Sequence, residues 1–355
     1  MELDPVERMR RIGETVDRLV SLDLWCKFAG RDVVRVMYDA ALAAMGNDCT
    51  SLTMEAARRL QAATQPGSEV LICTGNVLPP WMIIESDGPP GAAVIARMVN
   101  LALDAVPVLL VEPRWVEPMR QLVRAVGLTP IEKHEGGARR GAAVVRGFPA
   151  EDGEAARLAA QWLGAGGIAA VIAIEAIGRS ENGYYQTGTG GFDNTAYSAR
   201  FDYLFEEANR RGILTVGIGD HGGELGLGTI KDVIRRVVPT ARVATDPVRG
   251  GITPIVPAQV PLVCGISNWG GYGLAGCLAA LRGKPELMHD GRAEMRLLHA
   301  AADAGMIEGM GGFPEPAVDG LPVELHVGFV EILRAAVRRG MEAPFPRAIG
   351  FIPPN

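Results

Sequence analysis

From residue 69 to residue 281, short unbroken apolar runs alternate with amphipathic stretches that have helical spacing. The runs are too short for helices, and they lack the alternation of a strand with one wet face, so they are typical of strands covered on both sides. Strands that alternate with helices at this spacing form βαβ units. The sequence therefore predicts an α/β fold, a mostly parallel sheet with helices on both faces. The expected strands are 70–74, 106–111, 142–145, 169–174, 214–218 and 260–266, and the expected helices are 92–103, 116–126, 153–163, 197–210, 229–238, 272–281, 292–302 and 327–338.

Residues 1–65 have a purely helical pattern. Pro5 can begin a helix, and the apolar residues Met9, Ile12, Val16 and Val20 then recur at intervals of three and four. Two more stretches, 33–45 and 54–63, repeat this pattern. We therefore expect a helical N-terminal segment or cap over residues 1–65, followed by an α/β catalytic domain over residues 66–355.

The segment from Gly250 to Leu281 contains no charged residue and exceeds the roughly 20 residues that a membrane helix needs. Three prolines and the polar run 267–271 interrupt it, so we interpret it as buried core beside a loop. The chain begins MELDPVERMRRIGE, with acidic residues where a signal peptide is basic. These features predict no membrane association.

Charge and cysteine content exclude further classes of protein. Lys and Arg number 35 against 41 Asp and Glu, which gives a net charge of −6, and the lysines are isolated. A nucleic-acid-binding protein concentrates basic residues on one face, so we expect no nucleic-acid partner. The five cysteines are scattered and never spaced as CxxC, which disfavours a disulfide framework and a cysteine zinc site. A reducing cytoplasm is the expected compartment.

Polar, glycine-rich loops follow four of the predicted strands. Because ligands of open parallel sheets bind outside the carboxyl ends of the strands, we expect these loops to converge on one binding site. The four loops cover residues 75–91, 175–185, 219–228 and 267–273.

The third loop does not fit nucleotide binding. Gly217, Gly219 and Gly222 match the spacing GxGxxG, but Asp220 and Glu224 would repel a pyrophosphate at the helix N-terminus. The chain also lacks GxxxxGK[ST] and the GxSxG of serine hydrolases. Loop 219–228 is instead suited to bind a cation or an amine, or to carry out a proton transfer.

A metal site is one of the alternatives for the same loop. Asp220 and Glu224, with the adjacent His221 and with Glu175 or Asp87, would suit Mg²⁺ or Mn²⁺ better than zinc. Alternatively, these side chains cap helices and bind the loop backbone. No cofactor is therefore expected with certainty, and a divalent cation (Mg²⁺ or Mn²⁺) at Asp220 and Glu224 is the candidate.

Four segments, ESDGPPGA (85–92), AIEAIGRSENGYY (173–185), GIGDHGGELGLG (217–228) and GISNWGGYGL (265–274), resemble the D-glutamate cyclase C-terminal-like domain family over about residues 66 to 285. The resemblance implies a hydro-lyase that converts D-glutamate to 5-oxo-D-proline and water. The family pattern Gly-Asp-Gly-Gly-Asn-Glu here reads Gly219-Asp220-His221-Gly222-Gly223-Glu224, so a related small amino acid is a second candidate substrate.

Lactam formation needs a folded substrate, a base for the ammonium group and an acid for the γ-carboxyl group. We expect the proton transfers to use Asp220, Glu224 and Glu175, because clustered carboxylates separate in pKa into an acid and a base. Arg179 could bind a substrate carboxylate, and Ser267 and Asn268 could stabilise an oxyanion. The full expected substrate-binding set is Asp87, Gly88, Arg179, Tyr184, His221, Gly222, Gly223, Ser267, Asn268 and Trp269.

Two other functions stay open at this point. The chain could be a metal-dependent lyase or hydrolase of a small carboxylic acid, or it could bind an amino acid without turnover. In each case the partner is a small molecule, and a homodimer is an open alternative to a monomer.

Overall fold

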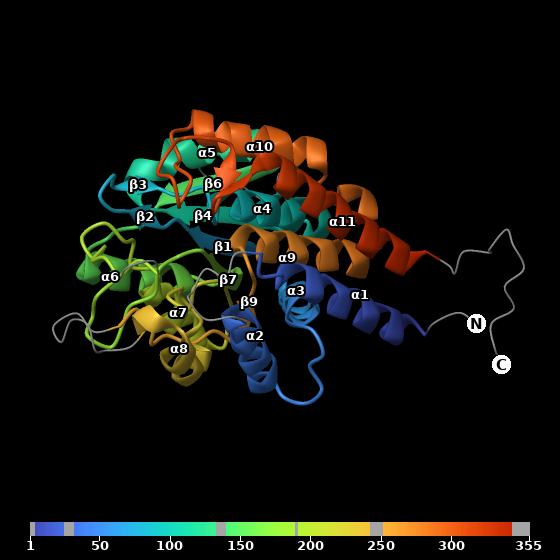
Figure 1. The fold of residues 1–355 in the computed structure, drawn as a ribbon, viewed down its shortest axis with the longest axis horizontal. Coiled ribbons are helices and arrows are strands. Elements are labelled where there is room, and N and C mark those ends of the chain that lie inside the picture. The colour runs from blue at the N-terminus through green and yellow to red at the C-terminus, as the bar shows by residue number, and fades with distance from the viewer. Residues whose placement is uncertain (1–3, 25–31, 133–139, 189–190, 242–250, 343–355) are drawn as a thin grey trace, which may run out of the picture.

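The computed structural model describes residues 4–24, 32–132, 140–188, 191–241 and 251–342 (Figure 1). Its centre is a seven-stranded sheet with the order β5-β6-β4-β1-β7-β8-β9, in which every paired strand is parallel. This confirms the predicted α/β fold. The strands are β1 (Glu69–Thr74), β4 (Val106–Val111), β5 (Thr129–Ile131), β6 (Ala142–Gly147), β7 (Ile168–Ile174), β8 (Leu214–Gly219) and β9 (Val260–Val263).

The strand order reverses between β1 and β7. From β1 the chain runs outward through β4 to β6, and it then returns to the other side of β1 to continue through β7, β8 and β9. Connections leave a crevice at such a reversal, outside the carboxyl ends of the two strands, and ligands of open α/β sheets bind there. The topology therefore places the candidate site at the ends of β1 and β7.

Helices cover both faces of the sheet, as the apolar runs predict. Alternate residues of β1 enter two separate cores: Val70 and Ile72 face one, Leu71 and Cys73 the other. The first core is covered by α4 (Pro89–Leu103), α5 (Val116–Ala125), α8 (Lys231–Val237) and α9 (Ser267–Leu281), and the second by α6 (Asp152–Gly164) and α7 (Asp202–Arg211). Short 3₁₀ helices occur at Pro113–Trp115, Gly228–Ile230, Pro239–Ala241 and Pro285–Leu287.

The N-terminal residues form the three predicted helices, α1 (Pro5–Val20), α2 (Val33–Ala44) and α3 (Leu52–Ala63). The buried carboxylate of Asp17 connects them, because it accepts hydrogen bonds from Tyr38 Oη at 2.6 Å, Leu52 N at 2.6 Å and Thr53 N at 3.1 Å. Their apolar side chains share the first core with α9.

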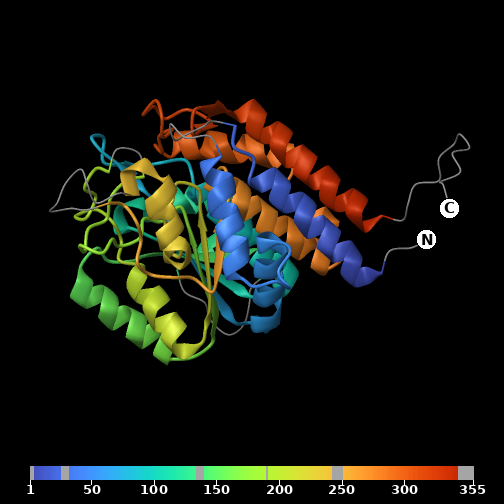
Figure 2. The ribbon, with the colours of Figure 1, turned by 60° about the horizontal axis from the view of Figure 1, so that its bottom comes forward.

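The C-terminal part adds α10 (Gly291–Asp303) and α11 (Val323–Met341) to the same side. Figure 2 shows the blue α1, the orange α9 and the red α11 running side by side. Two short hairpins were not predicted: β2 (Val77–Leu78) with β3 (Ile83–Ile84), and β10 (Ala317–Val318) with β11 (Leu321–Pro322). Asp319 and Gly320 form the second turn with positive φ of 53° and 73°, as two-residue hairpin turns require.

Several predicted boundaries are wrong: the strand expected over 260–266 ends at Val263, the helix expected over 327–338 begins at Val323, and two helix starts differ by five residues. The helix expected over 272–281 begins at Ser267, so the polar run 267–271 is its first part and not a loop. The reason is tertiary: the carboxylate of Asp87 accepts the N–H groups of Ser267 at 2.9 Å and Asn268 at 2.8 Å, and so supplies a cap that the local sequence lacks. The helix expected over 197–210 begins only at Asp202. Within the described ranges, no helix is both long and apolar enough to span a bilayer.

Candidate active site

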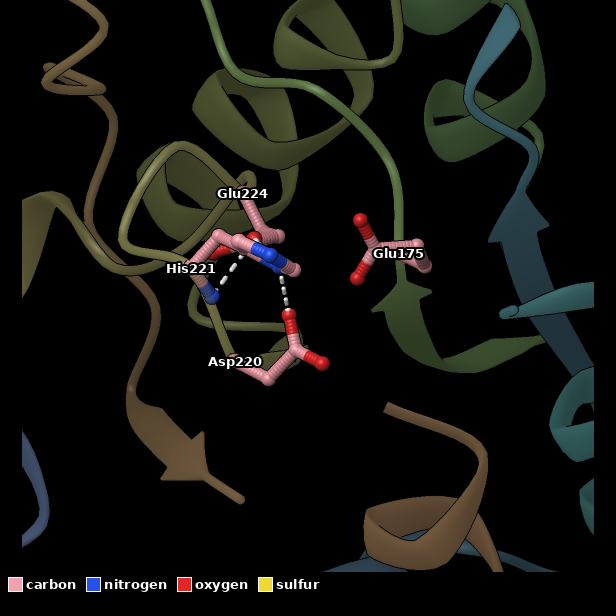
Figure 3. Close-up of side chains that lie close together, drawn as sticks. All are labelled: Glu175, Asp220, His221 and Glu224. Atoms are coloured by element: carbon pink, nitrogen blue, oxygen red, sulfur yellow. Dashed lines mark hydrogen bonds and ion pairs between the residues drawn. The ribbon is translucent and has the colours of Figure 1, made fainter. Parts of the chain in front are cut away.

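The carboxyl ends of β7 and β8 bring four of the predicted site residues together. Glu175 directly follows β7, and Asp220 directly follows β8. Four polar atoms lie within 4.8 Å of one another (Figure 3): one carboxylate oxygen each from Glu175, Asp220 and Glu224, and a ring nitrogen of His221. The expected convergence of these loops is therefore observed at the reversal point of the sheet.

Glu224 organises the turn that carries Asp220 and His221. Its Oε1 accepts the N–H of His221 at 2.9 Å, and its Oε2 accepts the N–H of Gly222 at 2.8 Å. Gly222 has a φ of +88°, and a Cβ on Gly219 would lie 2.6 Å from Glu224 Oε2, so both glycines let the backbone close around this carboxylate. With both oxygens occupied by backbone donors, Glu224 serves chiefly to shape the turn.

Asp220 and His221 form a pair. Asp220 is completely buried, and its Oδ1 bonds His221 Nδ1. The imidazole of His221 is partly accessible and lines a cavity. A buried aspartate that holds Nδ1–H of a histidine fixes the ring so that Nε2 is its basic atom. The pair can therefore accept a proton from the cavity, although the sequence suggested Asp220 itself for that role.

Glu175 faces His221 across the same cluster (Figure 3). Its carboxylate is 5% exposed and accepts the hydroxyl of Ser267 at 2.6 Å. Burial, and then the charges of Asp220 and Glu224, raise the pKa of Glu175 well above its usual value of 4.5. Its φ of +43° is rare for a residue with a side chain and costs about 1–3 kcal/mol, as is common at functional sites. Glu175 is thus a carboxyl group whose environment favours the protonated form, and its backbone is held in a strained position.

Three further polar residues, Asn76, Glu85 and Asp319, reach the site although they are not among the site residues named from the sequence. Asn76 and Glu85 belong to the expected loop 75–91, whereas Asp319 lies outside all four loops. Asn76 Nδ2 donates to Glu85 Oε1 at 2.6 Å. Burial, and then Asp319 and Asp87, raise the pKa of Glu85 well above 4.5. Asp319 comes from the β10–β11 hairpin, and its carboxylate lies within 4.8 Å of those of Asp87 and Asp220. The Asp-Gly pair at 319–320 is a recognisable hairpin signal, but nothing local places that hairpin against β1 and β8.

A cavity of about 270 Å³ opens beside this cluster. Buried polar side chains line one part of it, its floor, and exposed apolar side chains from three separate segments form its rim. None of the described lining residues is lysine or arginine. The lining residues are Asn76, Leu78, Pro79, Pro80, Trp81, Glu85, Glu175, Thr187, Gly188, Phe192, His221, Gly309, Met310 and Asp319.

Hydrogen bonds join the first turns of α4 and α9 beneath the site, through Asp87, Gly88 and Asn268. Asn268 Oδ1 accepts the N–H groups of Gly88 at 3.0 Å and Gly91 at 2.7 Å, and its Nδ2 donates to the carbonyl of Ser86 at 2.9 Å. Since Asp87 caps α9 in return, each helix caps the other. The amide of Asn268 is used in this contact, so the geometry favours a structural role over the expected oxyanion role.

Three predicted binding residues lie away from the cavity. The guanidinium of Arg179 pairs with Glu206 and stacks over Tyr203, so it does not point to a substrate carboxylate. Trp269 is buried and stacks on Phe329 with centroids 4.0 Å apart. Tyr184 is half-buried and is not among the residues that line the cavity.

Asn268→Ala is expected to lower the free energy of unfolding by about 2–5 kcal/mol. The substitution leaves two buried N–H groups and one buried carbonyl without their partner, and each such group costs about 1–3 kcal/mol. Urea unfolding followed by circular dichroism measures this loss. Asn182→Ala, at an exposed position, is the control and should change stability by no more than about 0.5 kcal/mol. A loss below about 1 kcal/mol for Asn268→Ala would contradict the capping role.

Stability is expected to fall as pH rises. Glu85 and Glu175 have pKa values in the folded chain that are raised well above 4.5, so above that pH the folded chain binds more protons than the unfolded chain. Their contribution to stability is therefore complete below about pH 4.5 and is lost as pH rises through the raised pKa values. The urea midpoint of Glu175→Gln should depend less on pH than that of the wild type between pH 5 and 8. Identical pH dependence would show that Glu175 is not the titrating group.

The sequence is similar to known proteins of one family. A family model described as "D-glutamate cyclase-like, C-terminal" matches residues 38–334. The human protein "D-glutamate cyclase, mitochondrial" is 30% identical over 234 residues, which cover 60% of this chain and 33% of that protein. The chain thus spans about a third of the length of this curated relative. The family match extends beyond residues 66–285, from α2 to α11, and so includes the hairpin that carries Asp319. The chain belongs to the D-glutamate cyclase-like, C-terminal family.

Proposed function

We propose that this chain is a hydro-lyase that cyclises a small amino acid, D-glutamate or a close relative, to its lactam 5-oxo-D-proline with release of water. The observation that carries the proposal is the pairing of two opposite proton-transfer groups in one cavity. Glu175 supplies a buried carboxyl whose raised pKa favours the protonated form, and the Asp220–His221 pair supplies a base. The family match supports the same chemistry.

The base acts on the substrate's amino group. His221 Nε2 takes a proton from the α-ammonium, which frees the nitrogen lone pair, while Asp220 keeps Nδ1–H and stabilises the imidazolium that forms. The lone pair then attacks the γ-carbon. Because nucleophile and electrophile belong to one molecule, a site that holds the chain folded avoids an entropic barrier that can reach about 7–11 kcal/mol.

The acid acts on the γ-carboxyl group. Glu175 donates its proton to a γ-carboxyl oxygen, which makes the carbon electrophilic and prepares that oxygen to leave. The C–N bond forms, one C–O bond breaks, and the two protons that leave the nitrogen end on the departing water. Transfer between His221 and Glu175, which lie in one cluster, restores both groups for the next turnover.

A divalent cation is a second candidate component of the same site. The ligand atoms of Glu175, Asp220, His221 and Glu224 lie within 4.8 Å of one another, and an oxygen-rich set suits Mg²⁺ or Mn²⁺. Such an ion would supply Lewis-acid polarisation of the γ-carboxyl group. Against it, both oxygens of Glu224 already accept backbone N–H groups. Mn²⁺ titration followed by electron paramagnetic resonance tests it: binding that Glu175→Gln abolishes supports the ion, and no binding at millimolar Mn²⁺ argues against it.

Product analysis tests the proposed reaction. The purified chain is incubated separately with D-glutamate, L-glutamate and each 5-oxoproline enantiomer, with and without EDTA, and the products are separated by chiral chromatography. Formation of 5-oxo-D-proline from D-glutamate that EDTA does not affect supports acid–base catalysis by protein groups alone. Loss of activity in EDTA, restored by Mn²⁺, supports the metal-dependent alternative. Binding of glutamate by calorimetry without any product supports an amino-acid-binding protein.

The compartment and the assembly are part of the same proposal. The described cysteines 49, 73, 264 and 277 are free, which suits a reducing compartment such as the cytoplasm. The human relative carries "mitochondrial" in its name, which describes that protein. A small-molecule substrate remains the proposed partner, with a homodimer as the alternative to a monomer.

A further inference from the structure

The cavity changes in character from its floor to its rim. At the floor, the carboxyl groups of Glu85, Glu175 and Asp319 are no more than 6% exposed. At the rim, the large apolar side chains Trp81, Phe192 and Met310 are 46%, 57% and 54% exposed. Exposed apolar side chains that gather at one cavity mark a binding surface more often than scattered ones do.

Contacts between distant segments of the chain hold the rim in place. Trp81 follows β2, and its indole packs against Gly312 of the C-terminal part so closely that a Cβ there would lie 2.3 Å from the ring. Gly312 can accept this contact because it has no Cβ, and its φ of +74° also favours glycine. The carboxylate of Glu308 holds the same loop by accepting the N–H of Met310 at 2.7 Å. Two segments more than 200 residues apart in the chain are thus locked together around the mouth.

Free glutamate fits neither the apolar rim nor the carboxyl groups of the floor well. It has no apolar surface to place against Trp81 and Met310, and its γ-carboxylate would meet a floor of carboxyl groups without a lysine or arginine among the described lining residues. A γ-amide with an apolar substituent on its nitrogen removes that negative charge and fills the rim. Burying such a substituent contributes about 25 cal/mol for each Å² of apolar surface.

We propose that the preferred substrate is a γ-glutamyl amide with an apolar amine portion, cyclised to 5-oxoproline with release of the amine. This inference rests on the proposed function and names its substrate class. The α-amino nitrogen attacks the γ-carbonyl carbon, the new C–N bond forms, and the bond to the amide nitrogen breaks. His221 takes protons from the attacking nitrogen, and Glu175 delivers a proton to the leaving nitrogen. The α-ammonium loses two protons: an alkylamine takes both and leaves as an ammonium ion, whereas the weaker base aniline takes one and leaves neutral while the other is released to solvent. The step therefore needs neither water nor a redox partner.

Parallel kinetics on two substrates test the proposal. The kcat/KM values for γ-glutamyl-anilide (both enantiomers) and for D-glutamate are measured in the wild type, in Trp81→Ala and in Ile332→Ala. Ile332 is an exposed apolar residue on α11, away from the cavity, and serves as the control. We expect the better anilide enantiomer to exceed D-glutamate by at least about 10-fold. Trp81→Ala should lower kcat/KM for the anilide by about 10-fold or more, which is the size of effect that one apolar contact gives in a pocket, and should lower kcat/KM for D-glutamate by a smaller factor. Ile332→Ala should leave both values unchanged.

Several results would overturn this inference, and they also show whether the proposed function fails with it. If D-glutamate is cyclised and the anilide is not cyclised faster, the substrate class is wrong while the proposed function stands. If neither compound is turned over, both fail. If Trp81→Ala lowers kcat/KM for both substrates by the same factor, the rim stabilises the fold and does not bind the substrate. If it changes the oligomeric state in analytical ultracentrifugation, the rim forms a subunit contact.

Discussion

Glu175→Gln is expected to lower turnover of D-glutamate by at least about 100-fold with the fold intact. General acid catalysis contributes about 10²–10⁴-fold, and glutamine keeps the size and the acceptor oxygen for the Ser267 hydroxyl but has no acidic proton. Glutamine is neutral at every pH, so it avoids the free-energy cost of burying Glu175 near Asp220 and Glu224 above the ordinary pKa of a glutamate, and the thermal midpoint should stay equal or rise.

Asp202→Asn is the matched control for Glu175→Gln. Asp202 is equally buried, and burial raises its pKa as well, but it lies at the start of α7 and accepts the N–H of Arg179 at 2.9 Å, outside the cavity. Its replacement should leave turnover within about 2-fold. Turnover and thermal midpoint are measured on the same preparations. Full activity in a folded Glu175→Gln variant would remove Glu175 from the mechanism.

Asp220→Asn is expected to reduce turnover by at least about 100-fold as well, for a different reason. Asparagine fits the buried space next to His221, but its side chain carries no charge to stabilise the imidazolium, and its amide can favour the wrong tautomer of the ring. The backbone turn is shaped by Glu224 and the glycines, so stability should change by no more than about 1 kcal/mol.

A conservative comparison separates the orienting role of Asp220 from a purely structural one. In Asp220→Glu the charge is kept, and part of the activity should return if charge near Nδ1 is what matters. Equal and full activity of Asp220→Asn would show that the residue is only a polar support for the turn.

The fold and the position of the site could be predicted because they depend on local patterns. Unbroken apolar runs such as 169–174 predict strands covered on both sides, and polar residues directly after them, Glu175 and Asp220, must lie at the carboxyl edge. The start of α9 differs from the predicted one because its cap is tertiary. Asp87 caps α9 from 180 residues away, which no local pattern reveals.

The missed and misplaced residues have the same cause. Asp319 reaches the site only because a C-terminal hairpin folds over the ends of β1 and β8, and a sequence shows the hairpin but not where it packs. Arg179 follows Glu175 closely in the chain, yet its side chain pairs with Glu206 on α7. The sequence therefore predicted where the backbone of each loop lies, but it did not predict the direction in which each side chain points.

The dependence of kcat/KM on pH tests most directly the claim that Glu175 is the acid of this site. Because Glu175 must be protonated to act, and its pKa is raised, the wild-type value should fall as pH rises through that pKa. The residual activity of Glu175→Gln should lack this alkaline fall. The account predicts a descending alkaline limb in the wild type that is absent from the variant; the same limb in both proteins, at similar rates, would contradict it.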